Sequence, residues 1–176
     1  PVPWWESRGR ISYFENSQGF QDPVDPGFDF DFPSFAQINV QRREAEWINA
    51  FHIGKWSTST VGLEYIHEEG ENKGTFKSRT HTQSVFFEQQ LRFFERLFIT
   101  GGVRVDDHSV FGTQVTERGS VAFMIKETGT RLRSGAGTGF RAPTLNDLFF
   151  PTFSSPDLKP EKSFSWEAGL DQTFWG

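Results

Sequence analysis

The stretch SFSWEAGLDQTF, residues 163–174, alternates between two kinds of side chain. Its even positions are Phe164, Trp166, Ala168, Leu170, Gln172 and Phe174, and its odd positions are Ser163, Ser165, Glu167, Gly169, Asp171 and Thr173. Successive side chains of a β-strand point to opposite faces of the sheet. The stretch therefore predicts a strand with one apolar face and one polar face.

The same period of two recurs along the chain and predicts eight strands in an all-β fold. It is clear in 60–65, 82–93, 97–106 and 163–174, and weaker in 8–16, 38–51, 115–126 and 130–139. No window approaches the ~18 consecutive apolar residues of a membrane-spanning helix, but a transmembrane barrel strand needs only about 9–11 alternating residues. The alternation alone fits a soluble β-sandwich and a membrane barrel equally well.

The connections between the predicted strands separate these two folds. Short links contain GKWSTS, FFER and KETGT, whereas the ranges 18–35, 70–77, 108–114 and 141–162 are longer or richer in polar, proline and aromatic residues. Short and long connections alternate strictly. This pattern predicts an antiparallel up-and-down transmembrane β-barrel with short periplasmic turns and longer extracellular loops.

One face of the predicted sheet is too charged for a closed core. It carries Glu64, Glu88, Arg92, Arg104, Lys126, Arg131, Arg133, Glu167 and Asp171. Burying an unpaired ion costs several kcal/mol, so this face predicts a wide lumen that is wet or plugged. The opposite face is apolar, as a lipid-facing band requires. Aromatic residues near the strand ends fit the girdles of a membrane barrel; they are Tyr13, Trp47, Tyr65, Trp166 and Trp175.

The composition argues against several functions. A net charge of −5 without a basic cluster argues against nucleic acid as a partner. The absence of cysteine excludes a disulfide scaffold and a thiolate site. The acidic pair Asp106 and Asp107 is interpreted as a solvated loop mouth. No group of histidines has the spacing of a metal site; the four are His52, His67, His81 and His108. No enzyme is expected.

Two motifs near the end of the sequence resemble those of a known family. GFRAPTL, 139–145, is followed by SPDLKPEKSFSWEAG, 155–169. Both resemble stretches of the barrel of TonB-dependent outer-membrane receptors, with Ser155 where the family usually has Asn. The matching positions are Gly139, Phe140, Arg141, Ala142, Pro143, Leu145, Pro156, Leu158, Pro160, Glu161, Ser163, Glu167 and Gly169. The resemblance covers at least residues 82–176, and within the family it is greatest to the cobalamin-transporter-like branch.

The resemblance implies a place and a function. Residues 1–176 would form part of one barrel domain, about eight strands of a barrel of about 22 strands, without its plug domain and final strands. The whole receptor would lie in the outer membrane of a Gram-negative bacterium, in contact with lipid and with its own plug. TonB would supply energy through the N-terminal part. The cargo would be a scarce large ligand such as cobalamin, a ferric siderophore or haem.

Two extracellular loops are the expected ligand contacts. The candidate residues are Asp22, Asp25, Phe28, Asp29, Phe30 and Asp31 in 18–35, and Phe149, Phe150 and Phe153 in 141–162. The aspartates of 18–35 offer hard oxygen ligands for calcium, although a turn region punctuated by Pro and Asp explains them more simply. No other metal and no cofactor is expected.

Two other classes of protein remain open on the residues alone. Eight strands are enough to close a small structural or adhesive barrel in the outer membrane. A secreted β-rich carbohydrate-binding module would also show strands of period two.

Overall fold

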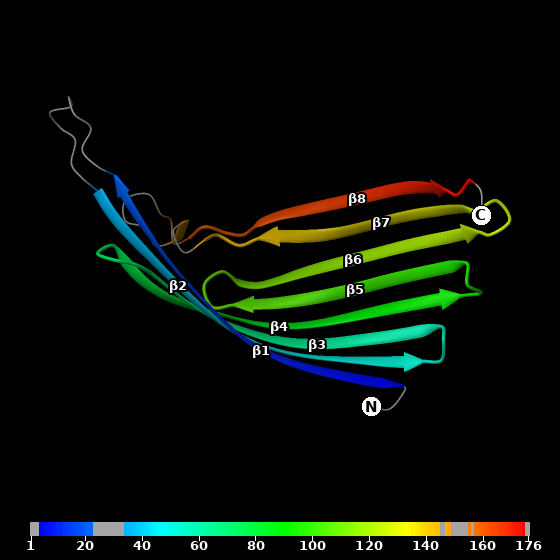
Figure 1. Ribbon diagram of the computed structural model, residues 1–176, viewed down its shortest axis with the longest axis horizontal. Coiled ribbons are helices and arrows are strands. Elements are labelled where there is room, and N and C mark those ends of the chain that lie inside the picture. The colour runs from blue at the N-terminus through cyan, green and yellow to red at the C-terminus, as the bar shows by residue number, and fades with distance from the viewer. Residues whose placement is uncertain (1–3, 23–33, 145–146, 149–154, 156, 175–176) are drawn as a thin grey trace, which may run out of the picture.

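The computed structural model describes residues 4–22, 34–144, 147–148, 155 and 157–174. They form one sheet in which each strand pairs antiparallel with its neighbour in the chain (Figure 1). The strands are β1 (Trp5–Asp22), β2 (Ser34–Ile53), β3 (Ser57–Asn72), β4 (Phe76–Phe93), β5 (Leu97–His108), β6 (Gly112–Ile125), β7 (Thr130–Arg141) and β8 (Glu161–Gln172). Within these residues, no helix is long and apolar enough to cross a bilayer.

The sheet is curved, and its connections gather at two opposite ends (Figure 1). The end with 54–56, 94–96 and 126–129 is called the turn end, and the end with 73–75, 109–111 and the described residues of 142–160 is called the loop end. At the loop end β1 and β2 twist away from the other strands (Figure 1). The described strands form an open meander in which β1 and β8 are the two edges.

All eight predicted strands are confirmed, and most extend beyond their predicted ranges. Strand β3, predicted over 60–65, covers Ser57–Asn72, because its ladder with β4 continues through polar residues that show no alternation. The strict alternation of connection lengths is wrong. The ranges 70–77 and 108–114 close through 73–75 and 109–111, which are as short as the connections at the turn end. Gly74 and Gly112 permit these tight turns with φ of 80° and 72°.

The two faces of the sheet differ as predicted, and each receives a name here. The outer face carries an apolar band with exposed side chains such as Val61, Leu63 and Val103. The inner face carries charged side chains, many of them ion-paired between strands, such as Arg131 of β7 with Asp171 of the neighbouring β8. Leu148 is the one fully buried hydrophobic residue among those described. A single sheet without a core is the form expected of a barrel wall between lipid and lumen.

The predicted charged face is confirmed at most positions. Glu64 and Arg104 form one ion pair on the inner face, and Arg131 and Asp171 form another. Arg133 lies 3.8 Å from a Glu167 oxygen. Lys126 is the exception, because it lies in the connection 126–129 and not in a strand. Its Nζ donates a hydrogen bond to Glu95 in the neighbouring connection 94–96 at 2.8 Å. Trp175 lies outside the described residues.

Candidate functional site

A row of polar side chains crosses the inner face of five strands. In the strand register, Arg10 of β1 lies opposite Glu46 of β2, and Glu46 lies opposite Glu64 of β3. Glu64 lies opposite Ser84 of β4, which lies opposite Asp106 of β5. Directly opposed residues are about 5 Å apart, so period two and register together bring these groups into contact. We call these residues, with the adjacent Arg42, Glu44 and Arg104, the lumen cluster.

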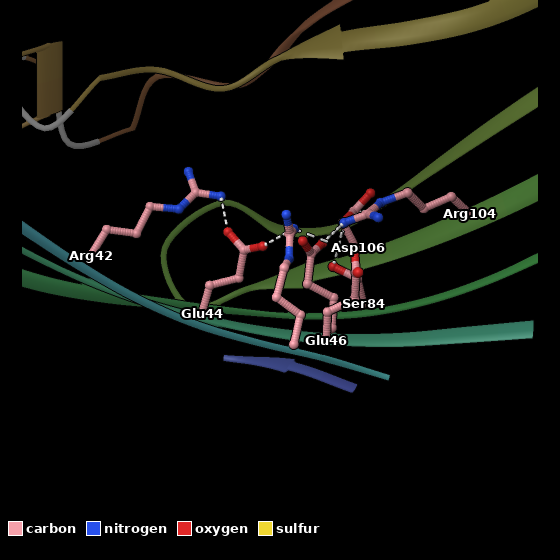
Figure 2. Close-up of polar contacts among 8 residues, drawn as sticks. Arg42, Glu44, Glu46, Ser84, Arg104 and Asp106 are labelled. Carbon is pink, nitrogen blue, oxygen red and sulfur yellow. Dashed lines mark hydrogen bonds and ion pairs between the residues drawn. The ribbon is translucent and has the colours of Figure 1, made fainter. Parts of the chain in front are cut away.

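Arg104 joins the carboxylates at one end of the lumen cluster (Figure 2). The Arg104 Nε donates a hydrogen bond to Asp106 Oδ1 at 2.8 Å. The Arg104 Nη2 donates to Ser84 Oγ at 2.9 Å and also forms an ion pair with Glu64. Ser84 Oγ donates to the same Asp106 oxygen at 2.6 Å. Asp106 is only 5% exposed, so these contacts compensate for its lost hydration. Its interpretation as part of a solvated loop mouth is therefore wrong, whereas Asp107 is exposed.

The other end of the lumen cluster is held by two arginines. Arg10 Nη2 donates to Glu44 Oε1 at 2.6 Å and lies 3.6 Å from Glu46. Arg42 Nη2 donates to the second Glu44 oxygen at 3.1 Å (Figure 2). Oxygens of Glu44, Glu46 and Glu64 lie within 4.8 Å of one another, close enough to share a cation. Because guanidinium groups already pair with these carboxylates, the arrangement is an ion-pair network on the lumen wall.

A glycine sets the height of Arg104 above the sheet. A Cβ atom on Gly62 would lie 2.1 Å from the Phe86 ring, so the outer end of that ring covers the glycine. The Arg104 guanidinium lies over the same ring, 5.9 Å from its centroid. Beside this stack is a hollow of about 410 Å³ whose lining includes Glu88 and Arg118. The Phe86 ring thus lies between Gly62 and the Arg104 guanidinium, and a recess with both polar and apolar lining adjoins it.

A second, more apolar pocket of about 480 Å³ lies at the loop end of the inner face. His108 and Phe111 stack within it at a centroid distance of 3.9 Å, and Phe140 meets Phe111 edge-on. Leu148 lines the pocket and is 1% exposed. Its other lining residues include Ile38, Val40, Phe76, Glu68 and Asp106. We call it the mouth pocket.

The motif segment after β7 holds Leu148 in the mouth pocket through a capping box. Thr144 N–H donates to Asp147 Oδ2 at 2.9 Å, and Asp147 N–H donates to Thr144 Oγ1 at 3.2 Å. The Leu148 N–H then donates to the Thr144 carbonyl at 3.1 Å. The hydrogen bonds from Thr144 hold the pKa of Asp147 below its usual value. This reciprocal pairing is the start signal of a helical turn.

The structure places the predicted family-motif residues around the segment 142–160. Gly139, Phe140 and Arg141 end β7, and Glu161, Glu167 and Gly169 lie in β8. Ala142 and Pro143 line the mouth pocket, and Leu158 and Pro160 precede β8. A Cβ on Gly169 would lie 3.0 Å from Arg133 Nε, so a larger residue there would push the Arg133 side chain aside. Leu145 and Pro156 lie outside the described residues.

The predicted ligand contacts remain predictions. Asp22 is the last residue of β1 at the loop end. The other candidates lie outside the described residues: Asp25, Phe28, Asp29, Phe30, Asp31, Phe149, Phe150 and Phe153. The structure therefore tests neither their contact with a ligand nor the calcium alternative in 18–35.

Sequence reasoning missed most of the lumen cluster and the mouth pocket. In β1 and β2 the inner face carries the even-numbered residues, which include Arg10, Arg42, Glu44 and Glu46. The alternation of apolar and polar residues in those strands is weak, so the sequence alone did not single them out. Ser84 carried no charge to mark it. The spacing from Thr144 to Asp147 is a readable capping signal that would have predicted the turn before Leu148.

The geometry defines the class of protein first: part of the wall of a transmembrane β-barrel, apolar toward lipid and ion-paired toward a lumen. The chain belongs to the family of TonB-dependent receptor-like β-barrels, whose family model matches residues 3–176. It is therefore part of an outer-membrane protein of the Gram-negative type.

Two curated relatives carry the same functional name. The chain is 32% identical to the vitamin B12 transporter BtuB of Photobacterium profundum over 145 residues, which cover 81% of this chain and 24% of the relative. It is 30% identical to the vitamin B12 transporter BtuB of Vibrio vulnificus over 133 residues, 73% of this chain and 22% of the relative. The chain thus spans about a quarter of the length of these relatives.

Solved structures share the fold. A mutant of the ferric enterobactin receptor PfeA of Pseudomonas aeruginosa matches with a TM-score of 0.82 and 16% identity, over 99% of this chain and 31% of that one. The copper transporter OprC matches with a TM-score of 0.84 and 16% identity, over 98% of this chain and 34% of that one.

Proposed function

We propose that the whole receptor carries out TonB-dependent uptake of a scarce large ligand across the outer membrane, with cobalamin as the first candidate. The observation that supports this most is the lumen cluster, a row of ion pairs across five strands on the face opposite the lipid. The names of the two curated relatives favour cobalamin. A ferric siderophore and haem are the alternatives.

In this proposal the described strands supply a wall, and no bond of the ligand changes. The carboxylates of the lumen cluster are already paired with Arg10, Arg42 and Arg104. Such a wall offers a plug domain a polar but largely neutral surface, which favours a contact that can be rearranged. The ligand would bind among the loop-end connections, beside the mouth pocket, and TonB would act through the N-terminal part of the receptor.

Family membership argues against the two other classes of protein. A secreted carbohydrate-binding module does not fit a chain whose match to the receptor barrel covers residues 3–176. A closed eight-stranded barrel would pair β1 with β8, and the order of the described strands has no such pairing. We therefore propose that the sheet is one part of a larger barrel domain.

Uptake by the full-length receptor tests the proposal. The receptor is expressed in a Gram-negative strain that lacks its own cobalamin receptor, and uptake of radiolabelled cyanocobalamin, ferric siderophore and haem is measured with and without TonB. We expect TonB-dependent uptake of cobalamin. Uptake of one of the other ligands alone would replace the candidate, and uptake of all three without TonB would refute the mechanism.

A further inference from the structure

The ladder between β6 and β7 stops before either strand ends. Toward the loop end, the last residues that pair are Arg118 of β6 and Gly137 of β7. Beyond that pair, β6 remains in its ladder with β5, and β7 remains in its ladder with β8. The two strands lie apart at the loop end (Figure 1). We call this break in the wall, between 112–117 and 138–141, the seam.

Thr138 closes the inner limit of the seam with its side chain. Its Oγ1 accepts a hydrogen bond from the Glu117 N–H at 2.9 Å and donates to the Glu117 carbonyl at 3.4 Å. In an antiparallel ladder the N–H and C=O of one residue point to the same neighbouring strand, and alternate residues share that direction. Val115 therefore points its N–H and C=O into the seam, where no described residue bonds them. At this place β6 is an open sheet edge inside the wall.

The open edge lies within the apolar band of the outer face. Val115 lies opposite Val105 of β5, which lies opposite Val85 of β4. Lipid chains cannot form hydrogen bonds with the N–H and C=O groups of a strand, so an open edge at this depth is strongly destabilising. The edge therefore requires a partner that supplies hydrogen-bonding groups.

Glu117 adds an unpaired charge at the same place. It lies on the outer face opposite Val103, in the row next to that of Val115. Between the rows of Leu91 and Val85, it is the one charged side chain on the described part of the outer face. Its carboxylate is exposed and forms no hydrogen bond or ion pair with any described residue. A charge on a lipid-facing surface is costly unless it meets an opposite charge.

We propose that the seam binds an extended segment of a second outer-membrane polypeptide, with a lysine or arginine against Glu117. The segment would pair its main chain with Val115, as a peptide does when it adds a strand to an exposed sheet edge. Its basic side chain would neutralise Glu117, and its apolar side chains would continue the outer band. A lipid amine also carries a positive charge, but it lacks the alternating donors and acceptors of a main chain. The proposal rests on the outer-membrane location and not on the transported ligand.

Two matched peptides test the charge preference of the seam. The probes are fluorescent peptides of alternating threonine and valine, one with a central lysine and one with glutamate at that place. They are titrated against the full-length receptor in phosphatidylcholine nanodiscs, and binding is measured by fluorescence anisotropy. We expect the lysine peptide to bind about tenfold more tightly, and Glu117→Gln to abolish this preference. The matched control is Glu161→Gln, an exposed carboxylate within the ladder of β7 and β8, which should leave the preference unchanged.

Proline at two neighbouring positions tests the main-chain edge itself. Val115→Pro removes the N–H that points into the seam, so it should weaken binding of the lysine peptide about fivefold with little loss of thermal stability. Thr116→Pro is the control, because the Thr116 N–H points to β5 and its loss breaks that ladder. Equal destabilisation by the two prolines would mean that the Val115 N–H already has a partner. That result, equal binding of the two peptides, or loss of the preference in nanodiscs that contain phosphatidylethanolamine would overturn the proposal.

Discussion

Single residues on the inner face are fixed by what lies above them. Gly62 is a glycine because the Phe86 ring occupies the space of a Cβ atom, and Arg104 lies over that ring. Gly101, one of the glycines of β5, has nothing within 4 Å of an added Cβ. The two positions therefore give a matched pair that separates close packing from general strand propensity.

Gly62→Ala should destabilise the receptor by about 1–3 kcal/mol, the usual cost of overpacking. Gly101→Ala should be neutral or slightly stabilising, because alanine suits a strand better than glycine. Thermal unfolding of the full-length receptor in detergent measures both. If the two variants unfold alike, the Phe86 ring does not limit position 62. The double variant Gly62→Ala, Phe86→Leu should recover most of the loss.

Arg104→Met should cost about 2 kcal/mol of unfolding free energy, less than the 3–5 kcal/mol of a fully buried pair because the arginine is partly exposed. The loss arises because Asp106 and Glu64 would remain without their shared cation. Arg10→Met is the control, since Arg10 is more exposed and Glu44 keeps Arg42. Urea unfolding compares them, and a larger effect of Arg10→Met would contradict the role given to Arg104.

At the scale of elements, the strand centres are predictable and their ends are not. Apolar and polar residues alternate in 60–65 because this part of the strand crosses the bilayer. There one face needs apolar side chains toward lipid, and the other needs polar side chains toward the lumen. Beyond Tyr65 both faces of β3 meet water, so the ladder with β4 continues through 66–72 without a hydrophobic signal. For this reason the sequence predicts long loops at 70–77 and 108–114 where the structure has tight turns.

The lumen cluster shows a second limit of the sequence. Arg10 and Asp106 belong to one row only because four antiparallel registers place them there. The face of the sheet on which each residue lies can be predicted from its own strand. The register between strands cannot, because it is set by pairing between segments that are distant in the sequence. The capping box of Thr144 and Asp147 is different, because both residues lie within one turn.

Thr144→Ala should loosen the segment that carries Leu148. It removes the hydroxyl that accepts the Asp147 N–H, a loss of about 1 kcal/mol for a capping residue. Hydrogen exchange of the Leu148 amide should become about fivefold faster, and Thr144→Ser should restore the wild-type rate. An unchanged rate in Thr144→Ala would mean that packing in the mouth pocket alone holds the segment.

The connections at the turn end should loosen in acid. Glu95 bonds Lys126, and Glu127 bonds Arg96, so these hydrogen bonds hold the pKa values of both glutamates below the usual 4.5. A lowered folded-state pKa contributes stability that is present above the usual value and is lost as the pH falls through the lowered value. Spin labels at Phe94 and Thr128 should gain mobility only below about pH 4.5. In Lys126→Gln with Arg96→Gln, mobility should be high at neutral pH already; a pH response that persists there would contradict this origin.

At the scale of the whole molecule, the account depends on one assignment: the outer face of the sheet meets lipid, and the inner face meets the lumen. Family membership and the ion pairs of the lumen cluster both agree with it. If the two faces were exchanged, the proposed contact between the lumen cluster and a plug domain would fail.

A nitroxide accessibility scan along β3 tests this assignment most directly. The chain has no cysteine, so single cysteines at Thr60, Val61, Leu63 and Glu64 would be the only labelling sites in this part of the receptor. In the full-length receptor in liposomes, Val61 and Leu63 should collide mainly with oxygen in the lipid, and Thr60 and Glu64 mainly with a water-soluble nickel complex. Accessibility without a period of two, or with the opposite phase, would contradict the assignment of the faces.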